Sequence, residues 1–184
     1  MLAGAGNAFD ILAYNAYYGG DKLDGRDWET PYLRGIMQAY QVPPKPMLIT
    51  ETALLCDPGC PKLQAYAVGR FYTRAISYDL LGTMWYIYDS DHFHNAAMVE
   101  PLDPNQHRPA YEAYQHAVTQ LKGVTYIGVL VGQPSGIEGH RFARPDGTLT
   151  VFWSSKAAGQ HPRRSLRHSR VYCVGWRAAA MFEY

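Results

Sequence analysis

Three short apolar segments, each followed by a helical pattern, constrain the fold of this chain more than any other feature. The segments are Phe9 to Tyr14, Pro46 to Thr50 and Gly82 to Tyr88. Near-continuous apolar runs of this length are typical of strands in a parallel sheet, whose two faces are both covered. We therefore expect three buried parallel strands.

Helices are predicted after each of these strands, because apolar residues recur there at intervals of three and four. Thr30 can cap the first helix, Pro31 fits its first turn, and Pro43-Pro44 ends it. The second covers 62–81, and the third runs from 108 to 121, before Gly123. This order predicts a parallel α/β fold, either a barrel or a doubly wound sheet. No glycine-rich phosphate fingerprint follows a strand, which argues against nucleotide binding.

The hydrophobic period changes after Val124. Segments 124–131, 139–143 and 148–153 alternate or run apolar, and Arg144-Pro145-Asp146-Gly147 is a typical hairpin turn. We therefore expect an α/β part over 1–123 and a β-hairpin or partial β-sandwich over 124–155. The segment 156–184 shows neither period and is expected to be an irregular tail, or coding sequence read out of frame.

Composition excludes several classes of partner. The formal net charge is +1, which gives no electrostatic case for nucleic acid or an anionic membrane. No window approaches the roughly 20 apolar residues that a membrane span needs. The first residues lack the basic and apolar regions of a signal peptide. Tyr and Trp, at fifteen and four residues, suit sugar rings but also ordinary cores.

Cys56 and Cys60 flank Asp57-Pro58-Gly59, a turn sequence that can bring two thiols together. A disulfide there implies an oxidising compartment. Unpaired thiols and a zinc half-site are the alternatives, although no second Cys/His pair with ligand spacing follows closely. His92 and His94 also lack a third ligand. We therefore expect neither a metal nor a cofactor.

Candidate site residues stand where the strands end, because ligands of parallel α/β folds bind beyond the carboxyl ends of the strands. Glu51 follows Met47-Leu48-Ile49-Thr50 directly and places a carboxylate at this edge. A helix-capping or loop glutamate is the alternative. Tyr17 could donate its hydroxyl to Glu51 and hold the carboxylate ionised, or it could simply pack. Glu51 and Tyr17 are the candidate catalytic residues.

Four further residues leave the same strand ends: Asn15, Trp85, Tyr88 and Asp89. Trp85 could form the floor under a sugar ring, or be an ordinary core tryptophan. Asp89, like Asp91, could bind sugar hydroxyls or be a solvated loop acid. We expect these four residues to bind substrate.

Together these motifs resemble the last three β/α units and the linked β-domain of clan A glycoside hydrolases, the retaining glycosidases built on a (β/α)8 (TIM) barrel. The resemblance covers Phe9 to Trp153. Asn15 with Tyr17 looks like the sixth-strand pattern, and Pro46 to Glu51 looks like the seventh strand with its nucleophile. Gly82 to Tyr86 is similar to the eighth strand with its platform Trp85. The segment 108–114 is similar to the start of the last helix.

The resemblance implies a partial (β/α)8 barrel with a small antiparallel β segment, in which Glu51 is the nucleophile of a double displacement. A second carboxyl group, about 5–5.5 Å away, protonates the leaving oxygen in such enzymes. In this clan it follows the fourth strand as Asn-Glu, a motif absent here, and neither Glu100 nor Glu29 is placed to substitute. The chain has 184 residues, whereas a complete barrel takes roughly 250.

The predicted function is therefore that of a glycosidase fragment with a carbohydrate substrate and little turnover of its own. A non-catalytic carbohydrate-binding or structural half-barrel is the alternative. The open sheet edges of a partial barrel predict self-association. Cys56, Cys60 and the substrate class suggest an extracellular or cell-envelope location, although the chain shows no signal peptide.

Overall fold

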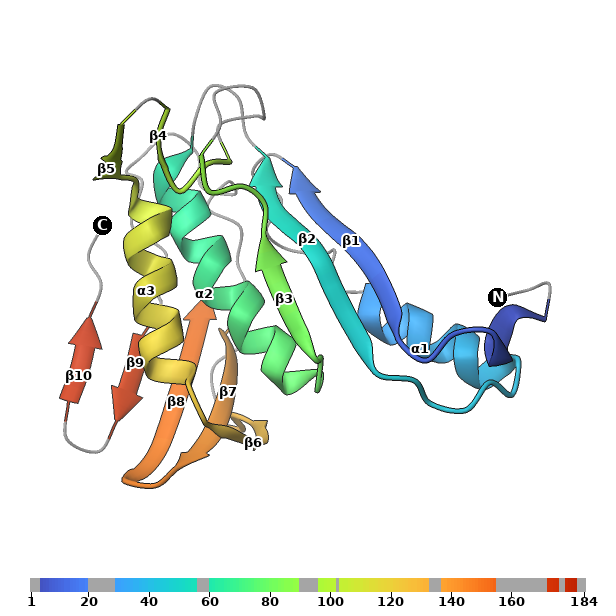
Figure 1. Ribbon diagram of the computed structural model, residues 1–184. Helices are drawn as coiled ribbons and strands as arrows, with labels where there is room; N and C mark the ends of the chain where they lie inside the picture. Colours follow the sequence, from blue (N-terminus) through green and yellow to red (C-terminus); the bar gives the residue numbers. More distant parts are fainter. Residues whose placement is uncertain are drawn as a thin grey trace, which may run out of the picture.

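The computed structural model describes residues 4–19, 29–55, 60–89, 96–101, 103–132, 137–154, 172–175 and 178–181 (Figure 1). Its elements are η1 (Ala5–Asn7), β1 (Leu12–Gly19), α1 (Glu29–Ala39), β2 (Met47–Leu55), α2 (Pro61–Ser77), β3 (Gly82–Trp85), β4 (Val99–Glu100), β5 (Asp103–His107), α3 (Pro109–Leu121), β6 (Thr125–Val129), β7 (Ile137–Arg144), β8 (Gly147–Ser154), β9 (Tyr172–Gly175) and β10 (Ala178–Met181). None of the described helices is long and apolar enough to cross a membrane.

Strands β1, β2 and β3 form a parallel sheet in that order, with α1 and α2 as the connections between them. The predicted parallel α/β order is thus confirmed, within a mixed α/β fold that also contains antiparallel sheets. Strand boundaries differ from the prediction. β1 continues through Gly19, although Asn15 and the tyrosines after it look like the start of a loop in the sequence.

The helices begin where the prolines indicate. Pro61 stands at the start of α2 and Pro109 at the start of α3, positions where the missing N–H costs no helical hydrogen bond. Pro31 lies in the first turn of α1. Each helix therefore starts within one residue of the predicted place.

Helix α2 is the centre of the molecule (Figure 1). On one side, Ala67 and Phe71 pack on β1 and β2 in an apolar cluster. On another side, Val68 joins a second cluster with α3 and with strands β7 and β8. Because α2 is covered from several directions, even its polar Gln64 and Arg70 are buried. Layers of this kind give each sheet the apolar cover that it needs.

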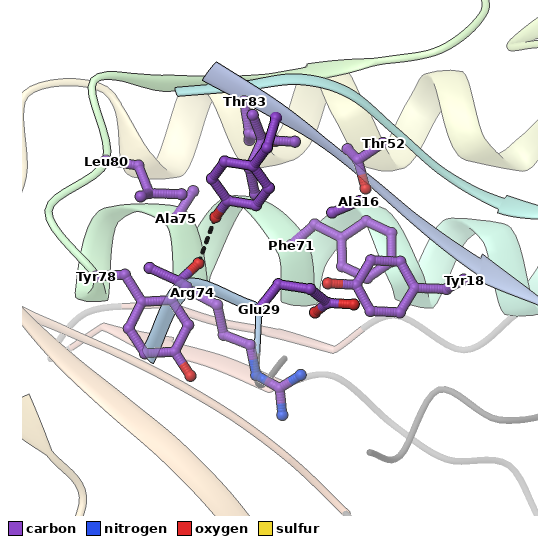
Figure 2. A pocket seen from close by; sticks show the side chains of 13 residues that line it. Ala16, Tyr18, Glu29, Thr52, Phe71, Arg74, Ala75, Tyr78, Leu80 and Thr83 are labelled. Atoms are coloured by element: carbon purple, nitrogen blue, oxygen red, sulfur yellow. Dashed lines mark hydrogen bonds between the residues drawn. The ribbon is translucent and has the colours of Figure 1, made fainter. Parts of the chain in front are cut away.

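The parallel sheet presents two different faces. Tyr14, Ile49 and Thr52 line a small pocket together with residues of α1 and α2, so both helices cover this face of the sheet. Figure 2 shows the pocket, in which Glu29 of α1 and Arg74 of α2 point into the same space. We call this the helix face, and the other side the opposite face.

A β-bulge in β2 changes which side chains reach each face. Tyr14 pairs with Ile49, but the next residue, Asn15, pairs with Glu51, so Thr50 is an extra residue on β2. The pairing with β3 shows the same irregularity between Ile49 and Thr52. Side chains alternate along a strand, and one extra residue reverses the alternation beyond it. Ile49 therefore lies on the helix face and Glu51 on the opposite face.

The second sheet is antiparallel, in the order β10-β9-β8-β7-β6. The turn expected at Arg144 to Gly147 lies between β7 and β8, and Gly147 adopts a positive φ of 140° there. Phe142, Leu149 and Trp153 of these strands are almost fully buried against α2 and α3. A second sheet that completes a β-sandwich remains a prediction.

The segment 156–184, expected to be an irregular tail, contains the strands β9 and β10 among its described residues. Residues Tyr172 to Gly175 pair with Leu149 to Phe152 of β8, and β10 pairs with β9. Strands of four residues are too short to show a period in the sequence. Their pairing supplies partners for backbone groups along the edge of β8.

Candidate functional site

The carboxylate of Glu51 lies on the opposite face of the parallel sheet, on β2 and directly after the bulge. Tyr17 of β1 donates its hydroxyl to Oε2 of Glu51 in a short hydrogen bond. Asn15, also on β1, donates from Nδ2 to the same oxygen over 3.2 Å. Both donors come from β1 because Asn15 stands beside Glu51 in the register and Tyr17 is two residues further on the same face. The structure therefore brings together three of the predicted site residues.

Tyr17 is held as a hydrogen-bond donor. Burial raises the pKa of its hydroxyl well above the usual 10.0, and the hydrogen bond to Glu51 and the charge of that carboxylate raise it further. A phenol that does not ionise keeps its proton for Glu51 at every physiological pH. The contact thus orients the carboxylate.

Tyr86 joins the same group, and sequence reasoning did not single it out. Its ring meets the ring of Tyr17 edge to face, with centroids 6.1 Å apart and planes at 87°. Tyr86 directly follows β3, and its peptide bond to Ile87 is cis. The signal that could have found it is alternation: Thr83 lines the pocket of the helix face, so Met84 and Tyr86 belong to the opposite face.

Trp85, expected as a sugar platform, lies on the helix side of the sheet. Its ring packs near Phe71 of α2, with centroids 6.1 Å apart, and its indole N–H donates to the backbone oxygen of Ala96 over 2.8 Å. It also contacts both apolar clusters. The structure does not bring Trp85 into the group around Glu51.

Tyr88 and Asp89 lie beyond β3 and are both exposed. The ring of Tyr88 meets that of Tyr111 of α3 at 6.4 Å, and Tyr111 in turn packs against His107 at 3.8 Å. These contacts place Tyr88 beside the start of α3. Its predicted role, and that of Asp89, as substrate ligands remain predictions.

Glu29 and Glu100 are the alternatives for a second carboxyl group at the site, and both lie away from Glu51. Glu29 lies in the first turn of α1 and lines the pocket on the helix face, across the sheet from Glu51 (Figure 2). Glu100 accepts two hydrogen bonds from Arg108, over 3.0 and 2.8 Å, and these lower the pKa of its carboxyl. Neither arrangement resembles a second carboxyl group directed at the site of Glu51.

The described residues contain no cluster of three or more His, Cys, Asp or Glu side chains that could hold a metal ion. His92 and His94 lie outside the described residues. So does Cys56, and its predicted disulfide with Cys60, the residue before α2, stays a prediction.

No protein-family model and no curated protein matches the chain. Among solved structures, it is similar to a family 39 glycoside hydrolase from the gut symbiont Bacteroides cellulosilyticus WH2. The identity is 18% and the TM-score 0.65, and the match covers 84% of this chain and 36% of that one. This chain thus spans about a third of the length of that structure.

A second similar structure is a GH128 endo-beta-1,3-glucanase from Amycolatopsis mediterranei. Its identity is 18%, its TM-score is 0.41, and the match covers 62% of this chain and 49% of that one. The structural neighbours are therefore glycoside hydrolases, and the likeness to the family 39 structure concerns the fold.

Proposed function

We propose that this chain carries the nucleophile of a retaining glycoside hydrolase of clan A. The observation that carries the proposal is the geometry of Glu51. Its carboxylate lies on the face of the sheet opposite to the helices, with Oε2 held by Tyr17 and Asn15. A carboxylate whose direction is fixed by two donors suits a nucleophile for an anomeric carbon.

The sheet supports placement in a (β/α)8 barrel. In a barrel, helices form an outer ring and the strands direct alternate side chains inward. Here α1 and α2 cover the same face of the three parallel strands, and α3 packs on α2. Met84, on the opposite face, is 53% exposed. These strands would be the sixth to eighth of the barrel, and the rest of the barrel would cover that face.

The proposed reaction is a double displacement. Glu51 attacks the anomeric carbon as the bond to the leaving oxygen breaks, which gives a covalent glycosyl ester. Water then attacks the same carbon, releases the sugar and restores the carboxylate. The acid that protonates the leaving group, and the base that takes the proton from water, would be one residue after the fourth strand, outside this chain.

A leaving group that needs no proton tests the nucleophile separately from the acid. 2,4-Dinitrophenolate departs as the anion, so the isolated chain should release about one equivalent from a matching 2,4-dinitrophenyl glycoside and then stall. Added azide, which needs no general base, should attack the ester and restore turnover as glycosyl azide. A panel of dinitrophenyl hexosides and pentosides is the probe.

Glu51→Gln should abolish both the burst and the azide-dependent turnover. The matched control is Glu112→Gln on the surface of α3, which removes an exposed carboxylate and should leave both intact. A panel without any Glu51-dependent burst would overturn the proposed nucleophile. Turnover of ordinary glycosides that Glu51→Gln abolishes would overturn the proposal that the acid is absent.

The second candidate function is a non-catalytic carbohydrate-binding or structural half-barrel. The edge-to-face pair of Tyr17 and Tyr86 favours it, because aromatic rings bind sugars without a carboxylate. Glycan affinity that is unchanged in Glu51→Ala, combined with no burst, would support sugar binding. Absence of any glycan binding would favour the structural role.

Three further proposals follow from the same function. The partner is a carbohydrate, and the location is extracellular or in the cell envelope, where a disulfide between Cys56 and Cys60 would persist. The chain self-associates, since β1 and β3 are the edges of the parallel sheet in the described part of the chain. Non-reducing mass analysis tests the disulfide. Sedimentation at two protein concentrations tests self-association.

A further inference from the structure

Thr50, the extra residue of the bulge, makes two polar contacts on β1. Its hydroxyl lies 2.7 Å from Oδ1 of Asn15 and 3.3 Å from the backbone oxygen of Tyr14. Both partners are acceptors, and a hydroxyl has a single hydrogen to donate. Thr50 therefore donates its hydroxyl hydrogen to Oδ1 of Asn15, the nearer acceptor.

This contact fixes the direction of the Asn15 amide. An asparagine side chain can turn by half a rotation and exchange its oxygen with its nitrogen, and only its hydrogen-bond partners decide between the two. Because Thr50 donates to Oδ1, the Nδ2 group faces Oε2 of Glu51. The turned amide would place an oxygen against a carboxylate oxygen, which is repulsive.

The direction of the amide decides how the two oxygens of Glu51 differ. Tyr17 and Asn15 both donate to Oε2, and no described residue makes a hydrogen bond to Oε1. A lone pair that already accepts a hydrogen bond is a weaker nucleophile. Oε1 is therefore the oxygen left to attack, while Oε2 is the oxygen that is held.

We propose that Thr50 is a positioning residue of the glycosidase site: it orients Asn15, so that both donors hold Oε2 of Glu51 and leave Oε1 as the attacking oxygen. This inference rests on the proposed function. Thr50 acts through Asn15 and does not itself contact substrate.

Three variants test it in the dinitrophenyl glycoside burst. Thr50→Val keeps the shape and removes the donor, so the burst should slow by roughly 10-fold, the effect of one hydrogen bond to a charged group. The pH of half-maximal burst rate should move upward, because the carboxylate loses a donor. Thr50→Ser should retain the wild-type rate and pH profile. Thr52→Val makes the same change on the helix face of the same strand and should leave both unchanged.

Nuclear magnetic resonance supplies a readout that needs no turnover. The Nδ2 resonances of Asn15 should shift as Glu51 titrates in the wild type and in Thr50→Ser, and lose this response in Thr50→Val. A Thr50→Val protein with the wild-type burst, pH profile and Asn15 response would overturn the inference. Thr50→Ser keeps the hydroxyl. If it also lost the wild-type burst, pH profile and Asn15 response, the loss in Thr50→Val would be due to packing, and the inference would be overturned.

The two proposals fail in different ways. A wild-type burst that Thr50→Val does not change contradicts the role of Thr50 alone. A wild type with no burst contradicts the proposed function and with it the catalytic part of this inference. The Asn15 titration then still shows whether Thr50 orients the amide.

Discussion

Arg74 of α2 and Glu138 of β7, 64 residues apart in the chain, form a two-point ion pair between the central helix and the antiparallel sheet. His140 contacts the same carboxylate, with Nε2 3.0 Å from Oε1. The guanidinium groups of Arg70 and Arg74 lie 5.3 and 5.2 Å from the ring centroid of Trp153 on β8. Charge and aromatic contacts thus fasten the antiparallel sheet to α2.

The stability of this junction should depend on pH. Burial alone would raise the pKa of the Glu138 carboxyl, but hydrogen bonds from His140 and Arg74 outweigh it and lower the pKa from 4.5 to about 2. A carboxyl with a lowered folded pKa contributes stability above its unfolded pKa. That contribution is complete above about pH 4.5 and is lost as the pH falls toward 2.

Glu138→Gln should therefore destabilise the protein by about 2 kcal/mol at pH 7, and the difference from wild type should vanish near pH 2. Urea unfolding at pH 7, 5, 4 and 3 measures this. Asp146→Asn is the control, since its contact with Arg144 is exposed and should contribute well under about 1 kcal/mol. A constant difference at all four pH values would contradict the prediction.

Tyr17→Phe removes the hydroxyl that holds Oε2 of Glu51 but keeps the ring that meets Tyr86. Loss of one hydrogen bond to a charged group should slow the burst about 10- to 100-fold. The melting temperature should change little, because the packing is conserved. Tyr32→Phe on the exposed side of α1 serves as the control. Equal burst rates in Tyr17→Phe and wild type would show that the contact has no role in the reaction.

Phe142 should be among the most important residues for the stability of the antiparallel sheet. It is fully buried in the cluster formed by α2, α3, β7 and β8. Phe142→Ala should destabilise the chain by about 3–5 kcal/mol, from lost burial and the cavity that remains. Val131→Ala removes methyl groups that are 76% exposed and should have little effect. Denaturant unfolding of both variants provides the comparison.

Two glycines should respond in opposite directions to the same substitution. A Cβ on Gly139 would lie 2.8 Å from Cβ of Leu130, an atom that no rotamer change can move. Gly139→Ala should therefore cost about 1–3 kcal/mol. Gly35 in α1 has nothing within 4 Å of the added atom, so Gly35→Ala should stabilise by about 0.5–1 kcal/mol through helix propensity. Calorimetry of the two variants would decide; stabilisation by Gly139→Ala would contradict the close approach.

Much of the fold follows from local chemistry that is visible in the sequence. The apolar run before Glu51 predicted a buried strand, and Pro61 and Pro109 marked the starts of two helices. The parallel order follows from helical connections between strands. That Tyr17 and Glu51 lie on neighbouring strands was also predictable. Both lie inside β1 and β2, however, and not beyond the strand ends as expected, and the bulge is what turns them to the same face.

The rest depends on relationships that no local pattern records. The sequence carries no mark of the bulge at Thr50, since its residues read as a regular strand. Trp85 and Tyr86 are neighbours whose side chains lie on opposite faces of the sheet, and the sequence does not show which of the two faces Glu51. The ion pair of Arg74 with Glu138 joins segments that are distant in the sequence. The charges of the two residues do not show that they are partners.

The bulge also means that the pairing of β2 with β1, and not only the identity of its residues, specifies the site. If Thr50 instead paired regularly with β1, the alternation would be unbroken and every later side chain on the strand would change face. The carboxylate of Glu51 would then turn toward α2 and the apolar layer around Phe71, where a charge without new partners is costly. Deletion of Thr50, in contrast, would remove only the extra residue and leave Glu51 beside Asn15 on the opposite face, so related chains that keep this site should either keep the bulge or be one residue shorter here.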